Sequence, residues 1–264
     1  MPSGFIRAAA FAVGVDLARR TRDADVLQLL AELRPLDCGK NLIRIGAEGD
    51  GGYLLPDDLE GIRYCFSPGV GPIATFENDL ADRDIRCFLA DYSVTSPPIQ
   101  RPEFTFDKKY VGANNSEISF SLKSWKDKYL RDYSGELLLQ MDIEGSEYEV
   151  LLSTPVEVLM NFRIMIIEFH YVNRMFDAFI FRLYKALFEK ILQHFHVVHI
   201  HPNNCCGSIR KGDIEIPVVM EFTFYNKSRV ASTAYQQHFP HPLDRDNVPE
   251  NPTLPLPRCW YDSR

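Results

Sequence analysis

The sequence predicts an α/β fold in which strands alternate with helices and form a largely parallel sheet. The run Leu137–Leu139 is typical of a strand buried on both faces, and an acidic turn and a helix-like pattern follow it. Residues 63–91 contain a strand, a helix and a second strand, and together they have about the length of a βαβ unit. A βαβ unit places its two strands parallel, so a parallel sheet is expected.

Size and composition indicate a globular protein without a broad nucleic-acid-binding surface. The 264 residues are 45% hydrophobic, which is enough for a substantial core in one large domain or two small ones. A net charge of −7 argues against binding nucleic acid through many phosphate contacts. The six cysteines have neither the spacing of a disulfide scaffold nor that of a zinc site. We therefore expect reduced thiols and a cytoplasmic protein.

The amino-terminal part contains an apolar patch, Ala8–Val15. This patch is far shorter than the roughly 20 residues that a membrane span requires. Asp16 and the arginines after it do not resemble a signal cleavage site. We expect no stable membrane span, and a fragment of a longer membrane-anchored chain stays open as the alternative. Whether the protein forms an oligomer also stays open.

Three segments are expected along the chain. Residues 1–42 form a helical extension, because apolar residues recur at helical spacing between Asp23 and Leu33 before Pro35 ends the pattern. Residues 43–230 hold the alternating strands and helices, and they begin with a glycine-rich hairpin or lid-like loop. Residues 231–264 are rich in proline, which predicts a tail that wraps the domain or a mobile arm.

Apolar runs predict the strands, and helical spacing predicts the helices between them. The helix that begins at Ser146 has capping-box spacing between Ser146 and Glu149. The other helices are expected at 73–83, 121–129 and 176–191. Seven strands are expected, at 63–67, 85–91, 104–111, from Leu137, at 162–170, 195–201 and 216–225.

A candidate cofactor site lies after the first two strands of the sheet. Gly69 and Gly71 follow a strand and precede a helix, so a ligand could approach the backbone and the helix amino terminus there. A valine at Gly69 should then obstruct the ligand and leave the helices intact. Asp91 ends the second strand about twenty residues later, where an acid can bind ribose hydroxyls. The pattern indicates a nucleoside-containing cofactor, and its alternative is a tight turn with an exposed Asp91.

Acids and histidines lie in or directly after the last residues of the fourth, fifth and sixth expected strands, where ligands bind in open α/β folds. Carboxylates and imidazoles together suit Mg²⁺, Mn²⁺ or Fe²⁺. The alternative is that the acids only stabilise a helix start and that the histidines are ordinary strand residues. The residues in question are Asp142, Glu144, Glu168, His170, His199 and His201.

The motif MDIEGSEYEVL at residues 141–151 resembles the acidic-glycine signature of the FkbM-like class I S-adenosylmethionine-dependent methyltransferases. The segment IIEFH at 166–170 follows at a family-like distance, and the resemblance covers roughly Ile43–Tyr225. It implies the class I methyltransferase fold, a Rossmann-like, seven-stranded mixed sheet with an antiparallel last strand and helices on both faces. It also implies methyl transfer to a hydroxyl of a sugar, a glycan or a secondary metabolite.

The resemblance also implies roles for individual residues. Two positions depart from the family pattern: Ser67 stands where many members have an acid, and Ile73 where a third glycine is common. Another residue is therefore expected to hold the amino group of the cofactor. The stretch Asp50–Tyr53 is similar to a segment that precedes the first strand in relatives. The expected cofactor-binding residues are Asp50, Gly52, Tyr53, Ser67, Gly69 and Gly71, with Asp91 at the ribose and Asp142 and Glu144 beside the methyl group.

Methyl transfer from a sulfonium is an in-line displacement, so the enzyme mainly positions the acceptor and helps it lose a proton. An alcohol needs a general base or a divalent cation for this step. We predict Asp142, Glu168 and His170 as catalytic residues, and Mg²⁺ or Mn²⁺ on Asp142, His170 and His201. Asn203 and Asn204 suit a polyhydroxylated acceptor.

Two other classes of function are open. One is a Rossmann-type NAD-dependent oxidoreductase, which the acid-rich turn after Leu137–Leu139 disfavours. The other is a catalytically silent relative that serves as a binding module.

Overall fold

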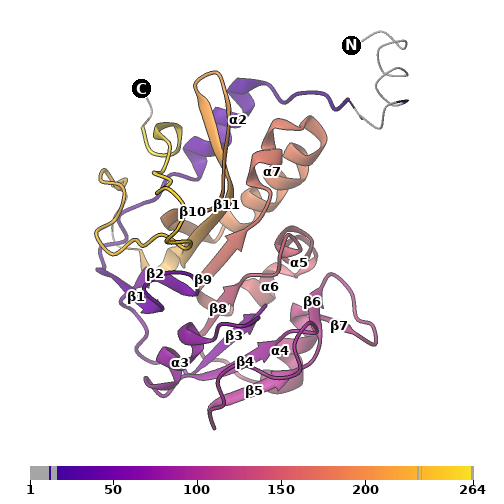
Figure 1. The fold of residues 1–264 in the computed structure, drawn as a ribbon. Helices are drawn as coiled ribbons and strands as arrows, with labels where there is room; N and C mark the ends of the chain where they lie inside the picture. Colours follow the sequence, from indigo (N-terminus) through magenta and orange to yellow (C-terminus); the bar gives the residue numbers. More distant parts are fainter. Residues whose placement is uncertain (1–11, 13–16, 231, 233, 263–264) are drawn as a thin grey trace.

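A seven-stranded mixed sheet forms the centre of the protein (Figure 1). The structure is a computed structural model, and it describes residues 12, 17–230, 232 and 234–262. The strand order is β10-β11-β9-β8-β3-β4-β5, and β11 runs antiparallel to both of its neighbours while the other pairs are parallel. This order and this antiparallel hairpin are typical of the class I methyltransferase fold, so the predicted fold class is confirmed. The strands are β3 (Tyr64–Pro68), β4 (Arg86–Ala90), β5 (Phe104–Asp107), β8 (Leu137–Met141), β9 (Phe162–Phe169), β10 (Phe195–Lys211) and β11 (Ile214–Asn226).

Side-chain alternation along these strands builds a separate core on each face of the sheet. In β8, Leu137 and Leu139 enter the core that also contains residues of α2, α4, α5 and α7. Leu138 enters the other core, against α3 and the antiparallel hairpin of β1 and β2. Because both faces are covered, the central strands are continuous apolar runs. The elements are β1 (Leu42–Gly46), β2 (Gly52–Pro56), α2 (Asp23–Glu32), α3 (Thr75–Ala81), α4 (Leu122–Leu130), α5 (Glu147–Ser153), α6 (Val156–Leu159) and α7 (Ala178–Leu192), with short 3-10 helices η1 (Val172–Phe176), η2 (Lys227–Arg229) and η3 (Arg258–Trp260).

The predicted strand 104–111 is in fact two strands. β5 ends at Asp107, whose carboxylate accepts hydrogen bonds from Trp125 Nε1 at 3.0 Å and from the Tyr129 hydroxyl at 2.8 Å. After it, β6 (Tyr110–Gly112) pairs with β7 (Ser119–Ser121) in a separate two-stranded sheet. The partners of Asp107 lie in α4, so the break depends on tertiary contacts that the local pattern does not contain.

The start of α5 also differs from the prediction. Ser146 has helical backbone angles and its side chain makes no capping hydrogen bond. The buried carboxylate of Glu147 accepts hydrogen bonds instead from the backbone N–H groups of Ile143 and Gly145, both at 3.0 Å. The turn that joins β8 to α5 is therefore fixed by a carboxylate inside it.

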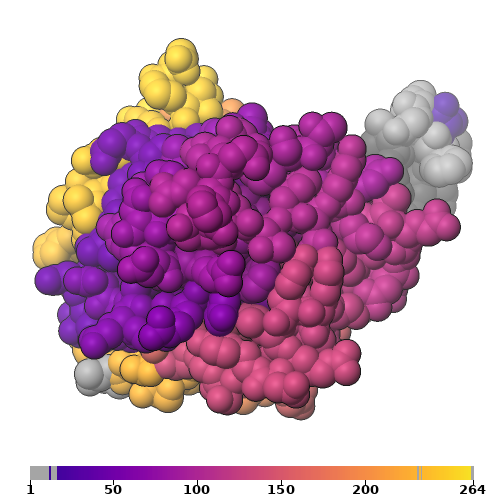
Figure 2. Space-filling model, turned by 90° about the horizontal axis from the view of Figure 1, so that it is seen from below, coloured from indigo at the N-terminus to yellow at the C-terminus, as the bar shows by residue number. Residues whose placement is uncertain are grey.

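The proline-rich tail wraps along β10 and β11 rather than forming a free arm (Figure 1). His199 Nε2 lies 2.9 Å from Asp244 Oδ1, and Asn204 Nδ2 donates to the Val248 carbonyl at 2.9 Å. Trp260 is fully buried and donates from Nε1 to the Glu215 carbonyl. Seen from below, the first half of the chain forms most of the surface and the tail lies along its edge (Figure 2).

Two further expectations concern the cysteines and the membrane. All six cysteines are free thiols in the structure, as predicted. Within the described part of the chain, no helix combines the length and the apolar character that a membrane crossing needs.

If the tail contributes to stability, removing the buried side chain of Trp260 should destabilise the protein. Trp260→Ala should lower the free energy of unfolding by about 3–5 kcal/mol, the usual effect of deleting a buried tryptophan. Urea denaturation measures this change, and Glu250→Ala, at an exposed tail position, is the control. Equal stability of the two variants would mean that the tail does not pack as described.

Candidate functional site

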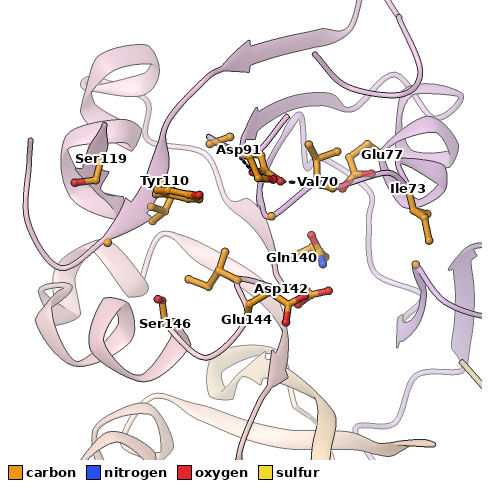
Figure 3. A pocket seen from close by; sticks show the side chains of 18 of the residues that line it. Val70, Ile73, Glu77, Asp91, Tyr110, Ser119, Gln140, Asp142, Glu144 and Ser146 are labelled. Atoms are coloured by element: carbon orange, nitrogen blue, oxygen red, sulfur yellow. Dashed lines mark hydrogen bonds between the residues drawn. The ribbon is translucent and has the colours of Figure 1, made fainter. Parts of the chain in front are cut away.

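A cavity of about 1000 Å³ opens at the carboxyl ends of β3, β4 and β8 (Figure 3). Its walls come from the β3–α3 loop, the end of β4, the β6–β7 region and the β8–α5 turn, and the hairpin turn at Asp50 closes one side. The carboxyl ends of parallel strands are where open α/β sheets bind ligands, and the volume is of the size that small-molecule sites have.

The two glycines of the β3–α3 loop have different roles. Gly69 has φ +89°, and a Cβ there would lie 1.5 Å from the backbone oxygen of Asp142. Glycine is thus required because two loops touch, so a valine at Gly69 would shift a loop backbone as well as obstruct a ligand, and its effect on the helices stays a prediction. Gly71 has φ +47°, and a Cβ there would meet nothing within 4 Å. Gly71 faces open cavity, so it is the position where a ligand can approach the backbone.

Asp91 is held rigidly at the middle of the cavity (Figure 3). Its Oδ2 accepts from the Gly71 N–H at 2.9 Å, and its Oδ1 accepts from the N–H and the hydroxyl of Ser93, both at 2.7 Å. The glycine loop and the acid about twenty residues later, which were predicted to act together, are therefore joined by a hydrogen bond. Beyond Asp91, Tyr110 and Ser119 of the β6–β7 region form the far wall.

Ser67 does not line the cavity, but it positions two residues that do. Its hydroxyl lies between the side-chain oxygens of Glu77 and Gln140, 2.7 Å from Gln140 Oε1. Glu77 comes from the first turn of α3 and is buried, and within the described chain it forms no ion pair. Burial raises the pKa of its carboxyl, although the hydrogen bond from Ser67 opposes this change. Sequence reasoning missed Glu77; the available signal was an acid ten residues after Ser67, in the first turn of the expected helix.

Asp142 lines the cavity where the β8–α5 turn begins. Burial raises the pKa of its carboxyl to about 7, and Oδ1 is buried without a hydrogen-bond partner. Glu144, next in the turn, has φ +58° and a side chain that is 87% exposed. The two acids assigned to the methyl group therefore both face the cavity, but of the two only Asp142 has a buried carboxylate oxygen without a partner.

His170 lies between carboxylates of the same turn. Its Nδ1 is 3.2 Å from Glu147 Oε1, and its Nε2 is 3.4 Å from Glu144 Oε2 and 3.9 Å from Asp142 Oδ1. Burial acts to lower the pKa of the imidazole, but the hydrogen bond and charge of Glu147, with the charges of Asp142 and Glu144, outweigh it and raise the pKa. Glu147 thus holds Nδ1, and Nε2 lies beside Glu144 and Asp142, an arrangement suited to a general base.

The structure does not assemble the predicted metal site of Asp142, His170 and His201. Two strands, β11 and β9, separate β10 from β8, and His201 Nδ1 lies 3.7 Å from Asp244 Oδ1 of the tail. Ligand atoms of Asp142, Glu147 and His170 do lie within 4.8 Å of one another. A divalent cation could be held there, but Glu147 Oε1 already fixes two backbone N–H groups and faces His170.

The remaining predicted residues lie around the hairpin. Asp50 and Tyr53 line the cavity, whereas Gly52 does not, and a Cβ at Gly52 would lie 1.9 Å from the Ala47 carbonyl oxygen. Gly52 therefore shapes the hairpin turn. Glu168 lies outside the cavity lining, and Asn203 Nδ2 donates to its Oε1 at 3.0 Å.

No protein-family profile matches the chain, and no curated protein matches its sequence. Among solved structures, the fibrillarin/Nop5p complex is similar at 16% identity and a TM-score of 0.36, over 64% of this chain and 74% of the other. The assignment of the fold rests on the order and direction of the strands.

The two glycines should respond differently to alanine. Gly69→Ala forces a backbone shift where two loops touch, so it should destabilise the protein clearly more than Gly71→Ala, which adds only the roughly 1–2 kcal/mol strain of a positive φ. Urea denaturation of the two variants gives the comparison. Equal losses would contradict the contact between Gly69 and Asp142.

Proposed function

We propose that the protein is an S-adenosylmethionine-dependent O-methyltransferase that acts on a hydroxyl of a sugar, a glycan or a related metabolite. The observation that carries this proposal is the arrangement of three acids, Asp91, Glu77 and Asp142, along one cavity at the carboxyl end of a methyltransferase-type sheet (Figure 3). The FkbM-like character of MDIEGSEYEVL agrees with it.

Each part of the cofactor has a chemically suited partner in the cavity. Tyr110 offers a ring for the adenine, and Asp91 offers a carboxylate for the ribose hydroxyls. Glu77, a buried acid without a cationic partner, suits the ammonium group of the methionine end, with Gln140 beside it. Asp142 then lies near the sulfonium. In this assignment Glu77 of α3 takes the role of the acid that many FkbM-like proteins have at the position of Ser67 in β3.

The reaction forms a carbon–oxygen bond to the acceptor and breaks the carbon–sulfur bond of the sulfonium that the cofactor supplies. The hydroxyl proton passes to His170 Nε2, and Glu147 on Nδ1 stabilises the imidazolium that results. A divalent cation on Asp142, Glu147 and His170 is the alternative way to acidify the hydroxyl. Loss of activity in EDTA and its return with Mn²⁺ would favour that alternative.

Binding of the cofactor depends on Asp91 in this proposal. Asp91→Ala should weaken S-adenosylmethionine binding by about 1.5–3 kcal/mol, the range for hydrogen bonds to a charged group. Isothermal calorimetry measures the change, with the exposed Asp132→Ala as control. An unchanged affinity in the folded variant removes Asp91 from the site, and binding of NAD in place of S-adenosylmethionine favours an oxidoreductase.

The proposed base predicts a pH profile. Neutral His170 accepts the proton, and its pKa is raised above the ordinary value, so turnover at saturating cofactor should rise with pH through that raised pKa. Glu147→Gln removes a charge that favours the imidazolium, so the rising limb should move to lower pH even if the maximum rate falls. A limb that stays in place would exclude the pair of Glu147 and His170 as the base.

A further inference from the structure

A row of acids crosses the sheet beside the cavity, on the face that the β1–β2 hairpin covers. Glu221 of β11 pairs in register with Glu168 of β9, and Asp142 directly follows Met141, which pairs with Ile167. The face is fixed by Thr223 of β11, which donates to the Leu54 carbonyl of β2 at 2.5 Å. We name Asp142, Glu168 and Glu221 the carboxylate row.

Two members of the carboxylate row have buried oxygens without partners. Glu168 is 4% exposed, and its Oε2 makes no hydrogen bond although Asn203 satisfies its Oε1. Asp142 Oδ1 is likewise unpartnered. Burial raises the pKa of Glu168, and the charges of Asp142, Glu221 and Asp50 raise it further. Leaving such oxygens unpaired is costly, so the row has the character of a site that is completed by a cation.

Glu221, at the far end of the row, already has partners. Asn247 Nδ2 donates to its Oε1 at 2.8 Å, and the charges of His201, His199 and Arg44 lower its pKa against the larger effect of burial. The members of the row with buried oxygens that lack hydrogen-bond partners are therefore the pair of Asp142 and Glu168, with His170 Nε2 3.9 Å from Asp142 Oδ1. Asp142 lines the cavity, so a ligand in the cavity can reach this pair from that side.

We propose that Asp142 and Glu168 bind a protonated amine of the acceptor, so that the substrate is an amino alcohol, such as an amino sugar, whose hydroxyl lies between His170 and the methyl donor. The proposal rests on the methyltransferase function proposed above and narrows its substrate class. An ammonium group donates three hydrogen bonds, and Asp142 Oδ1 and Glu168 Oε2 are buried acceptors of the carboxylate row that have no hydrogen-bond partner.

The carboxylate row offers two unpartnered acceptors, which suits an ammonium group better than a metal ion that takes six or more oxygen ligands. Metal–oxygen bonds of about 2.0–2.6 Å place the ligand oxygens of one ion no more than about 5 Å apart. Among the described residues, the group of three whose ligand atoms lie within 4.8 Å of one another contains Asp142 but neither Glu168 nor Glu221, so the carboxylate row does not form such a group. Hydrogen bonds of about 2.8 Å let one nitrogen join oxygens that are up to roughly 5.6 Å apart, which suits neighbours on adjacent strands about 4.8 Å apart.

The test uses two small probes that differ in one group, ethanolamine and ethylene glycol, titrated into the whole protein and followed by protein NMR. Ethanolamine should bind at least tenfold more tightly than ethylene glycol. Glu168→Gln should abolish this preference, whereas Glu117→Gln, which removes an exposed acid outside the cavity lining, should preserve it. If Glu168→Gln does not fold, Asp142→Asn provides the same comparison.

Equal binding of the two probes, or a preference that survives Glu168→Gln, overturns the proposal. Mn²⁺ that binds by electron paramagnetic resonance and displaces ethanolamine also overturns it, because the row would then be a metal site. S-adenosylmethionine binding is measured separately by calorimetry without the amine. If S-adenosylmethionine does not bind but the preference for ethanolamine is intact, the methyltransferase function is rejected and the cation site is kept. If S-adenosylmethionine binds but ethanolamine is not preferred, only the amine subsite is rejected.

Discussion

The main chains of two loops touch at the carboxyl end of the sheet, and the candidate site depends on this contact. The Asp142 N–H donates to the Pro68 carbonyl at 3.3 Å, and the space beside Gly69 is too small for any side chain. The contact joins the loop after β3 to the turn after β8. It therefore fixes Gly71 and Asp142, which belong to distant parts of the sequence, on two walls of one cavity.

Some carboxylate oxygens around this contact hold the loops in shape, and others have no hydrogen-bond partner. Glu147 and Asp91 accept hydrogen bonds from backbone N–H groups of their own or neighbouring loops, and they hold those loops in shape. Asp142 Oδ1, Glu168 Oε2 and the second oxygen of Glu147, Oε2, are buried without hydrogen-bond partners. Because an unsatisfied buried polar atom destabilises the folded protein by about 1–3 kcal/mol, such atoms are better explained by a ligand than by the fold.

Local patterns predicted much of the fold, because strands buried on both faces can be recognised in the sequence as apolar runs. The strands β8 and β9 were predicted from such runs. The connection between Gly71 and Asp91 was predicted from the spacing of a glycine loop and an acid within a strand–helix–strand unit. Contacts between distant segments were not visible. Glu77 contacts Ser67 only because α3 packs on that face of the sheet. His201 lies beside Asp244 because the tail passes there, and the composition of the tail does not predict its path.

The central claim is that the cavity holds an adenosyl cofactor with its amino-acid end on Glu77. A crystal structure of the protein with S-adenosylhomocysteine tests it most directly. We predict ribose hydroxyls on Asp91, the amino group within hydrogen-bonding distance of Glu77, and the sulfur facing Asp142. A nucleoside bound away from Asp91, or an amino group that contacts neither Glu77 nor Gln140, would contradict the claim.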